Sequence, residues 1–185
     1  MHPSVWRLRK TLRFELATLT DPSNSLHTRS TTSKESASTM KLIIRAGSHI
    51  CAVNLADVVE TMRPVPVEYL AGAPEGVLGI SVIRGASVPV VNLASLLGER
   101  DESVAIRFVT IRTGERQVAL SVDEVLGIRD IPPTLQKEMP PLLREARPDI
   151  VEAVGTLDAE LLLILKAGSL LREEVWNLVR IAQEH

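Results

Sequence analysis

The stretch from Gly76 to Gly98, GVLGISVIRGASVPVVNLASLLG, decides how the rest of this 185-residue chain is interpreted. It predicts a strand, a tight turn at Arg84-Gly85-Ala86-Ser87, a second strand beginning at Val88, and then a short helix. The glycine of this turn supplies the positive φ that a tight hairpin turn requires. Pro89 cannot donate a ladder hydrogen bond, so its strand lies at a sheet edge or turns that amide position outward. The stretch therefore predicts an apolar hairpin with a single arginine at its tip.

The composition argues against several classes of protein. A hydrophobic content of 45% is ordinary for a globular domain, and a formal net charge of −2 gives no strong field for phosphate backbones or anionic lipids. No apolar run approaches the ~20 residues that span a bilayer. One cysteine excludes an internal disulfide framework, and the four histidines lack the spacing of metal ligands. We expect a soluble, cytoplasmic protein that binds no nucleic acid and does not insert into a membrane.

Residues 1–39 differ in character from the rest of the chain. A basic cluster at Trp6–Lys10 is not followed by the apolar stretch of a secretory signal, and Ser and Thr dominate from Thr18 to Thr39. Such a segment has too little apolar surface to offset its ordering entropy. We predict that 1–39 is a disordered extension outside the fold and that regular patterning begins at Met40. A transit peptide is the alternative, which the acidic residues Glu15 and Asp21 weaken.

The remaining chain contains an internal duplication. The segment from Ile44 to Val59 resembles the segment from Ile111 to Leu126, and Val77 to Leu97 resembles Ala153 to Leu171. The second resemblance includes a spacing difference of about two residues, which a shorter hairpin would absorb. Each copy predicts a strand, a Gly turn, a strand and a short helix that opens near an Asn or Ser able to cap it.

We therefore predict two subdomains, 40–98 and 104–172, within one domain that covers 40–172. Each has about five short strands, Gly- and Pro-rich connections and one-turn helices, an arrangement that favours small closed or nearly closed barrels because closure removes sheet edges. Packing the two together buries Val and Leu side chains, each worth about 1.5–3 kcal/mol. A groove between the barrels would be the default place for a partner to bind. The predicted fold is mainly β, with two five-stranded barrels packed together.

The end of the chain predicts an amphipathic helix from about Ser169 to Ala182, and we expect 173–185 to pack on the domain as a C-terminal helix. Trp176 either anchors this helix on the second barrel or faces a partner. Between Ile131 and Pro148 the sequence predicts a loop rich in Pro and charge, which could contain a short helix over 141–145.

The sequence contains no catalytic constellation. His49 is predicted at a strand entry without a group to orient it, and Cys51 is predicted to be a small buried hydrophobic side chain. The spacing of Gly76, Gly79 and Gly85 fits neither of the common nucleotide-binding loops. We expect no enzymatic activity, no cofactor and no bound metal.

Several segments, taken in their order and spacing, carry a resemblance to a known family. They are Val58-Val59-Glu60, Gly79-Ile80-Ser81-Val82-Ile83-Arg84-Gly85, Val88-Pro89-Val90-Val91-Asn92-Leu93, Val122-Asp123-Glu124-Val125, and Gly155 with Leu162-Leu163-Ile164-Leu165. Together they resemble the CheW family of chemotaxis coupling proteins over almost all of 40–172. The resemblance implies two SH3-like five-stranded barrels around a shared hydrophobic core. It also implies a non-catalytic adaptor that couples chemoreceptors to the CheA histidine kinase.

The resemblance further implies a receptor-binding site. Arg84 matches the family arginine implicated in receptor contact, and Val58 and Glu60 match positions on a short helix that borders the same groove. Val82 and Ile83 complete the predicted site. The implied partners are the cytoplasmic tip of a methyl-accepting chemoreceptor and the regulatory domain of a CheA-type kinase, which would hold the protein in receptor arrays at the inner membrane. A solvated turn arginine with a surface ion pair is the alternative for Arg84.

The sequence departs from the family pattern at two positions. The family usually has asparagine where Val82 stands and commonly aspartate where Asn92 stands, which suggests a repacked hairpin and leaves the partner more open than the fold. An adaptor in a non-flagellar pathway, such as control of pili or of a second messenger, is the alternative function. A small-barrel nucleic-acid binder is a further alternative, disfavoured by the near-neutral charge and the few aromatic residues.

Overall fold

The computed structural model describes residues 39–99, 106–138 and 149–183, which belong to one compact unit. The elements are β1 (Met40–Ala46), β2 (His49–Asn54), η1 (Leu55–Asp57), β3 (Val58–Met62), β4 (Val77–Ile83), β5 (Ala86–Asn92), α1 (Leu93–Leu96), β6 (Arg107–Thr113), β7 (Arg116–Val122), β8 (Glu124–Asp130), η2 (Pro133–Leu135), β9 (Val151–Leu157), β10 (Glu160–Leu165), η3 (Ala167–Ser169) and α3 (Glu173–Gln183). The fold is therefore mainly β, as predicted. The predicted extension up to residue 38 and the short helix over 141–145 lie outside the described residues.

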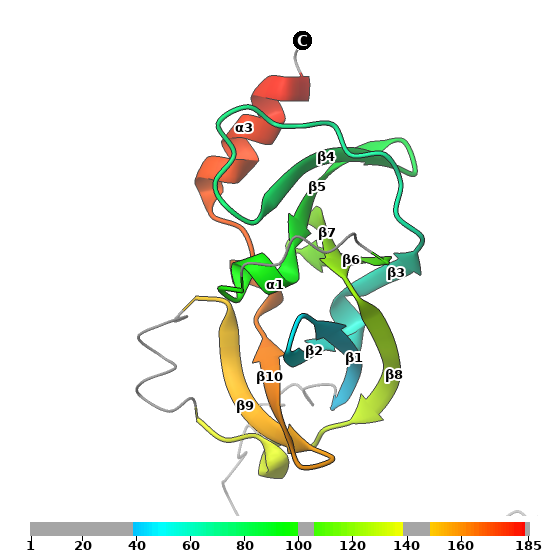
Figure 1. Ribbon diagram of the computed structural model, residues 1–185, viewed down its shortest axis with the longest axis vertical. Helices are drawn as coiled ribbons and strands as arrows, with labels where there is room; N and C mark the ends of the chain where they lie inside the picture. The colour runs from blue at the N-terminus through cyan, green and yellow to red at the C-terminus, as the bar shows by residue number, and fades with distance from the viewer. Residues whose placement is uncertain (1–38, 100–105, 139–148, 184–185) are drawn as a thin grey trace, which may run out of the picture. The chain divides into compact units, whose positions relative to one another are not determined.

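The strands form two five-stranded sheets, which can be followed in Figure 1. The first sheet has the order β8-β1-β2-β10-β9 and the second the order β3-β6-β7-β5-β4. Each sheet contains one parallel pair, β2 with β10 and β5 with β7, while the other pairs are antiparallel. Replacing β1 to β5 by β6 to β10, and the reverse, converts one order into the other. The internal duplication is thus confirmed at the level of topology.

The two sheets do not follow the predicted subdomains 40–98 and 104–172. The first sheet combines β1 and β2 of the first segment with three strands of the second, and the second sheet combines three strands of the first segment with β6 and β7. The reason is the parallel pairing, because Ile50–Ala52 align with Leu162–Ile164 and Val90–Asn92 align with Ala119–Ser121. Each copy therefore completes the sheet of the other copy rather than its own.

The register of the duplication also differs from the sequence alignment. Strands β4 and β9 both have seven residues and both lead into a two-residue turn. Val77 therefore corresponds to Val151 and Arg84 to Asp158, with no shorter hairpin between them. Gly155, which the sequence aligned with Gly79, lies two residues further along its strand.

Both sheets are open within the described residues, so closure into barrels is not confirmed. Strands β8 and β9 are the edges of the first sheet, and β3 and β4 are the edges of the second. One residue bridges the outer side of β4, since the amide and carbonyl of Glu68 bond to Ile80 at 2.7 and 2.8 Å. Lys137 bridges Val154 of β9 in the same way, at 2.7 and 3.1 Å. Such bridges cover part of an edge that would otherwise offer unpaired backbone groups.

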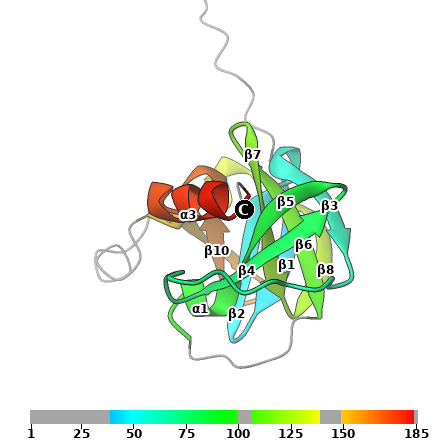
Figure 2. The same cartoon turned by 90° about the horizontal axis from the view of Figure 1, so that it is seen from above.

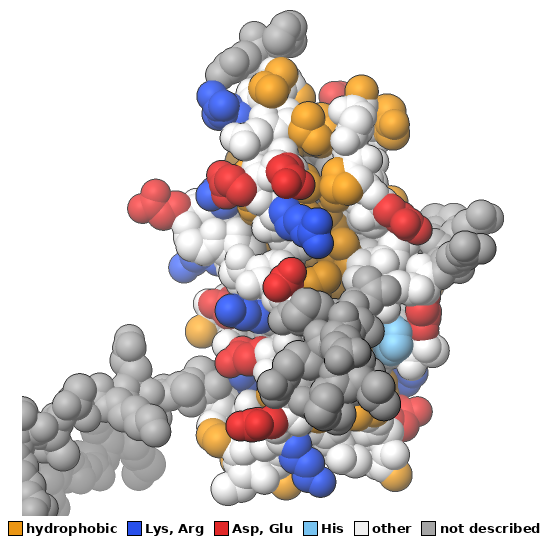
Figure 3. Space-filling model, turned by 90° about the vertical axis from the view of Figure 1, so that its left-hand side faces the viewer, with side chains coloured by type: hydrophobic (Ala, Val, Ile, Leu, Met, Phe, Trp, Pro, Cys, Tyr) orange, Lys and Arg blue, Asp and Glu red, His pale blue; other side chains and the backbone are white. Residues whose placement is uncertain are grey.

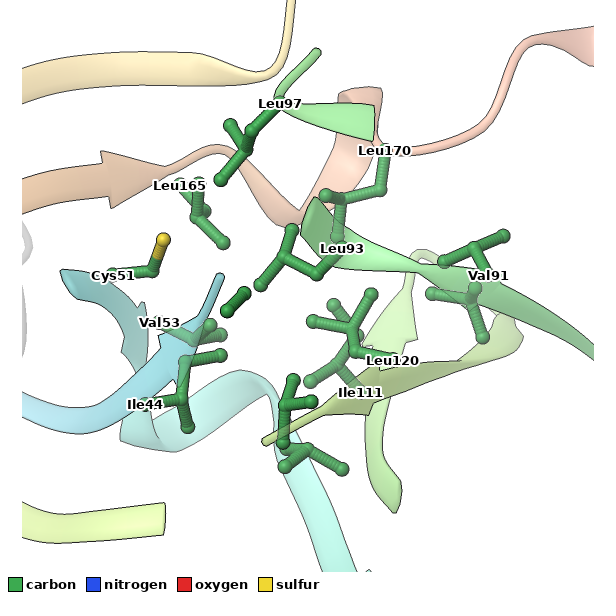
Figure 4. Close-up of a cluster of buried hydrophobic side chains, with 14 of the residues drawn as sticks. Ile44, Cys51, Val53, Val91, Leu93, Leu97, Ile111, Leu120, Leu165 and Leu170 are labelled. Carbon is green, nitrogen blue, oxygen red and sulfur yellow. The ribbon is translucent and has the colours of Figure 1, made fainter. Parts of the chain in front are cut away.

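Buried apolar side chains form one cluster shared by the two sheets and one further cluster on each sheet. In the shared cluster, Ile44, Cys51 and Val53 of the first sheet face Leu93, Ile111 and Leu120 (Figure 4). The other face of the first sheet carries Ile43, Ile50, Ala52, Ile131, Leu162 and Ile164, and the other face of the second carries Ile83, Val88, Val90, Phe108 and Ala119. The central strands are thus buried on both faces, which explains why their sequences are nearly continuous apolar runs. The shared core agrees with the expectation from the family resemblance.

The hairpin β4–β5 contains the predicted turn, shortened to Arg84-Gly85. Strand β5 lies between β7 and β4, so Pro89 is not in an edge strand. Pro89 stands opposite Ile80, whose amide and carbonyl bond outward to Glu68. The pair needs no donor from Pro89, and the ladder to β7 begins one residue later, at Val90. After the strand, the Asn92 side chain accepts a hydrogen bond from the Ser95 amide and caps α1. The capped helices predicted after Asn54 and Ser121 are not formed, because Asn54 makes no side-chain cap bond to η1 and β8 begins at Glu124.

Helix α3 begins at Glu173, after η3, and lies beside the β4–β5 hairpin in Figures 1 and 2. Val175 and Val179 are buried against the shared cluster. Trp176 is partly buried, and the Arg116 guanidinium of β7 lies 4.7 Å from the centre of its ring. Part of Trp176 thus packs on the domain, and the side chain also lines a hollow together with Ser87 and Arg116. No helix in the described part of the chain is both long and apolar enough to cross a bilayer.

Candidate protein-binding surface

Arg84 occupies the first position of the two-residue turn between β4 and β5. Its φ is 53° and that of Gly85 is 80°, so both residues are in the left-handed region. A type I′ turn requires this conformation at both positions because it matches the twist of the flanking strands. The turn holds the arginine at the tip of the hairpin, where its side chain is 80% exposed.

Glu60 reaches the same place from β3. The sequence predicted Val58 and Glu60 on a short helix, and this prediction is wrong. The helical part is only η1, which ends at Asp57, and Val58 already pairs with Ile111 of β6. The β-branched pair at 58 and 59 fits a strand, and the open edge of β6 supplies its partner. The ladder shifts register between Val58 and Glu60, so Val59 lies in a bulge.

The guanidinium of Arg84 holds the Glu60 carboxylate with two hydrogen bonds. Nε donates to Oε1 at 3.2 Å and Nη2 donates to Oε2 at 2.9 Å. This hydrogen bond and the charge of Arg84 lower the pKa of the Glu60 carboxyl, and Glu60 raises the pKa of Arg84 in return. The Glu60 side chain is only 22% exposed. The structure thus brings together Arg84 and Glu60, the two charged residues of the predicted site. They form a surface ion pair, which is the alternative that the sequence left open for Arg84.

The three predicted apolar residues have different environments. Val82 is 66% exposed, whereas its neighbour Ile83 is buried in the cluster of the second sheet. Successive residues of a strand point to opposite faces, so only one of the two is available to a partner. Val58 is partly buried against the shared core. Val59, which the sequence analysis did not select, is exposed beside Glu60, and only the bulge could have indicated it.

A hollow of about 320 Å³ lies beside Val82, between the segment that crosses β4 and the end of α3. Its lining residues are Val65, Pro66, Glu68, Tyr69, Leu70, Ile80, Val82, Ser87 and Ala182. Tyr69 is 81% exposed there. The segment is tied down by the Glu68–Ile80 bridge and by Ser81, whose hydroxyl donates to the Pro66 carbonyl at 2.6 Å. No motif in the sequence pointed to this segment, because its position depends on contacts with β4.

Residues 41–175 match the family described as CheW-like domain, which is more than half of the chain. The chain belongs to the CheW family. The chemotaxis protein CheW of Rhizobium meliloti (strain 1021) is 34% identical over 100 residues, 50% of this chain and 64% of that protein. The probable chemotaxis protein CheW of Rhizobium etli is 24% identical over 134 residues, 71% of this chain and 86% of that protein.

The fold of this CheW-like domain is also that of a solved CheW structure. The crystal structure of the scaffolding protein TtCheW from Thermoanaerobacter tengcongensis superimposes with a TM-score of 0.61 at 22% identity, covering 69% of this chain and 88% of that chain. The recognition of the family from the sequence is therefore confirmed. The chain spans about two thirds of the Rhizobium meliloti relative and most of the Rhizobium etli relative.

The two departures from the CheW pattern have separate structural roles. Asn92 is buried and caps α1, a task that its amide oxygen performs without charge. Val82 adds an apolar side chain to the exposed face of β4, next to the turn that carries Arg84. The hairpin of this CheW-like domain is therefore more apolar at its surface than the family pattern would make it.

A second hollow of the CheW-like domain lies between α1 and α3, on the side that faces the viewer in Figure 3. It has a volume of about 520 Å³, and a band of hydrophobic side chains crosses this side between charged ones. Its walls come from both halves of the duplication, at Val77 and Leu96 and at Ile150 and Leu170. This is a groove of the predicted kind, but Arg84 and Glu60 do not line it.

The described residues of the CheW-like domain contain no group of three His, Cys, Asp or Glu side chains that could hold a metal ion. Burial raises the pKa of the Cys51 thiol to about 12, so it is a packed hydrophobic side chain, as predicted. His49 lies at the start of β2, where its Nε2 is 3.4 Å from Oε1 of Glu99.

Proposed function

We propose that the protein is a non-catalytic adaptor that couples chemoreceptors to a CheA-type histidine kinase in bacterial chemotaxis signalling. Membership of the CheW family supports this role. The partners are the cytoplasmic tip of a methyl-accepting chemoreceptor and the regulatory domain of the kinase. Through them the protein sits in receptor arrays at the cytoplasmic face of the inner membrane. The structural observation that carries the receptor site is the Arg84–Glu60 pair, with Val59 exposed beside Glu60 in the sequence and Val82 exposed two residues before Arg84.

The chemistry of this surface specifies what the receptor must offer. The tip of a long helical hairpin can lay apolar side chains on Val59, Val82 and Tyr69, all of which are exposed. A receptor carboxylate can compete with Glu60 for Arg84, because a guanidinium presents its donors in a planar fork that fits a carboxylate with two parallel bonds. In this contact, apolar side chains of the receptor pack on the exposed apolar residues, and a receptor carboxylate replaces Glu60 as the partner of Arg84.

The experiment is a pull-down of receptor-bearing membranes by the purified protein with Arg84→Glu. We expect binding to fall at least tenfold, while the circular dichroism spectrum and Tm stay near those of the wild type. Asp158→Lys is the matched control, because Asp158 holds the same position in the duplicate hairpin β9–β10 and also has a positive φ. It should bind like the wild type.

A charge-swapped variant separates the position of the charge from the ion pair itself. Arg84→Glu combined with Glu60→Arg keeps a pair across the same edges but places the arginine on β3. We expect it to melt like the wild type and still to bind poorly. Full binding by Arg84→Glu would remove this arginine from the site. Capture of neither receptor nor kinase by the wild type would overturn the proposed function as a whole.

A further inference from the structure

A hydroxyl group without a hydrogen-bond partner lies inside the second sheet. Thr110 of β6 is 0% exposed, and its Oγ1 has no donor or acceptor among the described residues. Water satisfies a hydroxyl in the unfolded chain, so leaving it unpaired in the fold is unfavourable. A valine of almost the same shape would avoid that loss. The hydroxyl therefore calls for an explanation beyond packing.

Thr110 lies directly opposite Glu60. The two residues form a pair between β3 and β6, and Met62 pairs with Phe108 two residues further along. Phe108 belongs to the second sheet's own cluster, on the face that does not meet the shared core, and the partly buried Met62 packs against it. Because side chains alternate between faces with a period of two, Glu60 and Thr110 share that face. The unpaired hydroxyl thus lies on the inner side of the Glu60 carboxylate, and Arg84 lies on the outer side.

We propose that Thr110 is a positioning residue of the binding surface, whose hydroxyl takes over the Glu60 carboxylate when a partner carboxylate engages Arg84. Side chains of directly opposed residues have Cβ atoms about 4.5–5.5 Å apart, within reach of a glutamate. A rotating hydroxyl can donate to the carboxylate, which makes a charge-assisted bond. The partner's engagement of Arg84 rests on the proposed function, but the exchange between donors belongs to this chain alone.

The duplicate sheet shows that the fold itself does not require this hydroxyl. At the corresponding pair of the first sheet, Ile43 of β1 stands opposite Gly127 of β8. That position holds an apolar side chain buried in the first sheet's own cluster, with no carboxylate across from it. The hydroxyl and the glutamate therefore occur together in the sheet that carries Arg84, and neither occurs at the equivalent place in the other sheet.

The exchange can be tested without any partner, by removing Arg84. The probe is the Glu60 side-chain carboxyl ¹³C resonance of the full-length protein, titrated with acid. In Arg84→Ala, adding Thr110→Val should raise the Glu60 pKa by about one unit, because the carboxylate then loses its second donor. Thr110→Ser keeps the hydroxyl and should leave the pKa of the Arg84→Ala protein unchanged. With Arg84 present, Thr110→Val should have no effect on Glu60.

Thr113→Val is the matched control, since Thr113 of β6 also carries a buried Oγ1 without a partner but pairs with Arg116. It should not move the Glu60 titration in either background. An equal shift with and without Arg84, or no shift in the Arg84→Ala protein, would overturn the proposal. The threonine substitutions remove or keep one hydroxyl and Arg84→Ala removes an exposed side chain, so a folded protein is expected, and a cooperative melting curve verifies it.

A binding arm connects the exchange to the proposed function. Receptor-bearing membranes serve as the probe, and Thr110→Val should weaken their capture several-fold while Thr110→Ser and Thr113→Val do not. If Arg84→Glu leaves capture unchanged, the proposed receptor site fails, yet the titration still decides the exchange. If the titration shows no coupling while Arg84→Glu abolishes capture, only the role of Thr110 is overturned.

Discussion

Arg84 and Glu60 join the two edges of one sheet. Glu60 lies on β3, one edge strand of the second sheet, and Arg84 follows directly on β4, the other edge strand. The backbone ladder does not close this sheet in the described residues, and a pair of side-chain hydrogen bonds spans its open side instead. A partner that competes for Arg84 therefore breaks a link between β3 and β4, and so changes how these two edge strands are held together.

The Arg84–Glu60 pair should make a small, pH-dependent contribution to stability. Arg84 lowers the pKa of Glu60 in the folded protein, so the contribution is complete above the ordinary pKa of a glutamate and is lost as the pH falls through the lowered value. We expect Glu60→Gln to lower Tm slightly at neutral pH and to match the wild type in strong acid. Melting curves over this range measure it. A difference in Tm that grows toward acid would contradict the assignment.

Gly79 should be essential for the packing of the segment that covers β4. Its φ is 145°, and a Cβ there would lie 2.0 Å from the Glu68 carbonyl oxygen. Gly79→Ala should lower the free energy of unfolding by about 2–4 kcal/mol, as measured by urea denaturation. The control is Gly168→Ala, because Gly168 lacks a positive φ and has open space where the methyl group would lie. A Gly79→Ala protein as stable as this control would show that the segment around Glu68 can move away from β4 at little cost in free energy.

An arginine should be able to replace His49 in its ion pair, because Arg116 holds the same position in the duplicate hairpin. His49 faces Glu99, which follows α1, and Arg116 faces Glu173 at the corresponding place after η3. Arg116 is always charged, whereas His49 pairs as an ion only when protonated. His49→Arg should stabilise the protein by up to about 1 kcal/mol near pH 8, because an arginine is charged there and presents a planar fork of donors to Glu99.

The reciprocal variant checks this interpretation. Arg116→His should lower the free energy of unfolding near pH 8, because the introduced histidine is mostly neutral there and no longer forms an ion pair with Glu173. It also weakens the contact with the Trp176 ring, worth about 0.5–1 kcal/mol. Both effects are read from urea denaturation at pH 8. If His49→Arg and Arg116→His both leave the free energy of unfolding unchanged, the ion pairs at this position do not contribute to stability.

Cys51 should be unreactive in the folded protein. Its side chain is fully buried, and desolvation raises the pKa of its thiol to about 12, so almost no thiolate exists near pH 8. We expect no labelling by a thiol reagent such as DTNB in native buffer and complete labelling in urea. Fast labelling of the native protein would mean that β2 opens readily from the shared core.

The sequence predicted those features that depend on local chemistry. The turn that carries Arg84 and Gly85 and the duplication follow from turn geometry and repeated pattern, and both are present. Strand exchange between the copies could not be predicted, because strands buried on both faces have the same apolar pattern whichever neighbour they pair with.

Two features of the candidate site escaped prediction for a different reason. Val58 begins a strand because β6 offers an edge to it, and Tyr69 reaches the surface because Glu68 bridges β4. Both depend on residues far away in the sequence, while the local pattern around them is short and ambiguous. The burial of Ile83 beneath the exposed Val82 could have been deduced from strand alternation alone.

The exchange of strands between the copies also sets an order of assembly during translation. All five strands of the second sheet have been synthesised once the ribosome has passed Val122, the end of β7. The first sheet must wait for β10, which ends at Leu165, so β1 and β2 spend most of synthesis without their parallel neighbour. Long-range pairing of this kind is slow and exposes apolar edges to aggregation. The strands of the sheet that carries Arg84 are thus all available well before the first sheet can be completed.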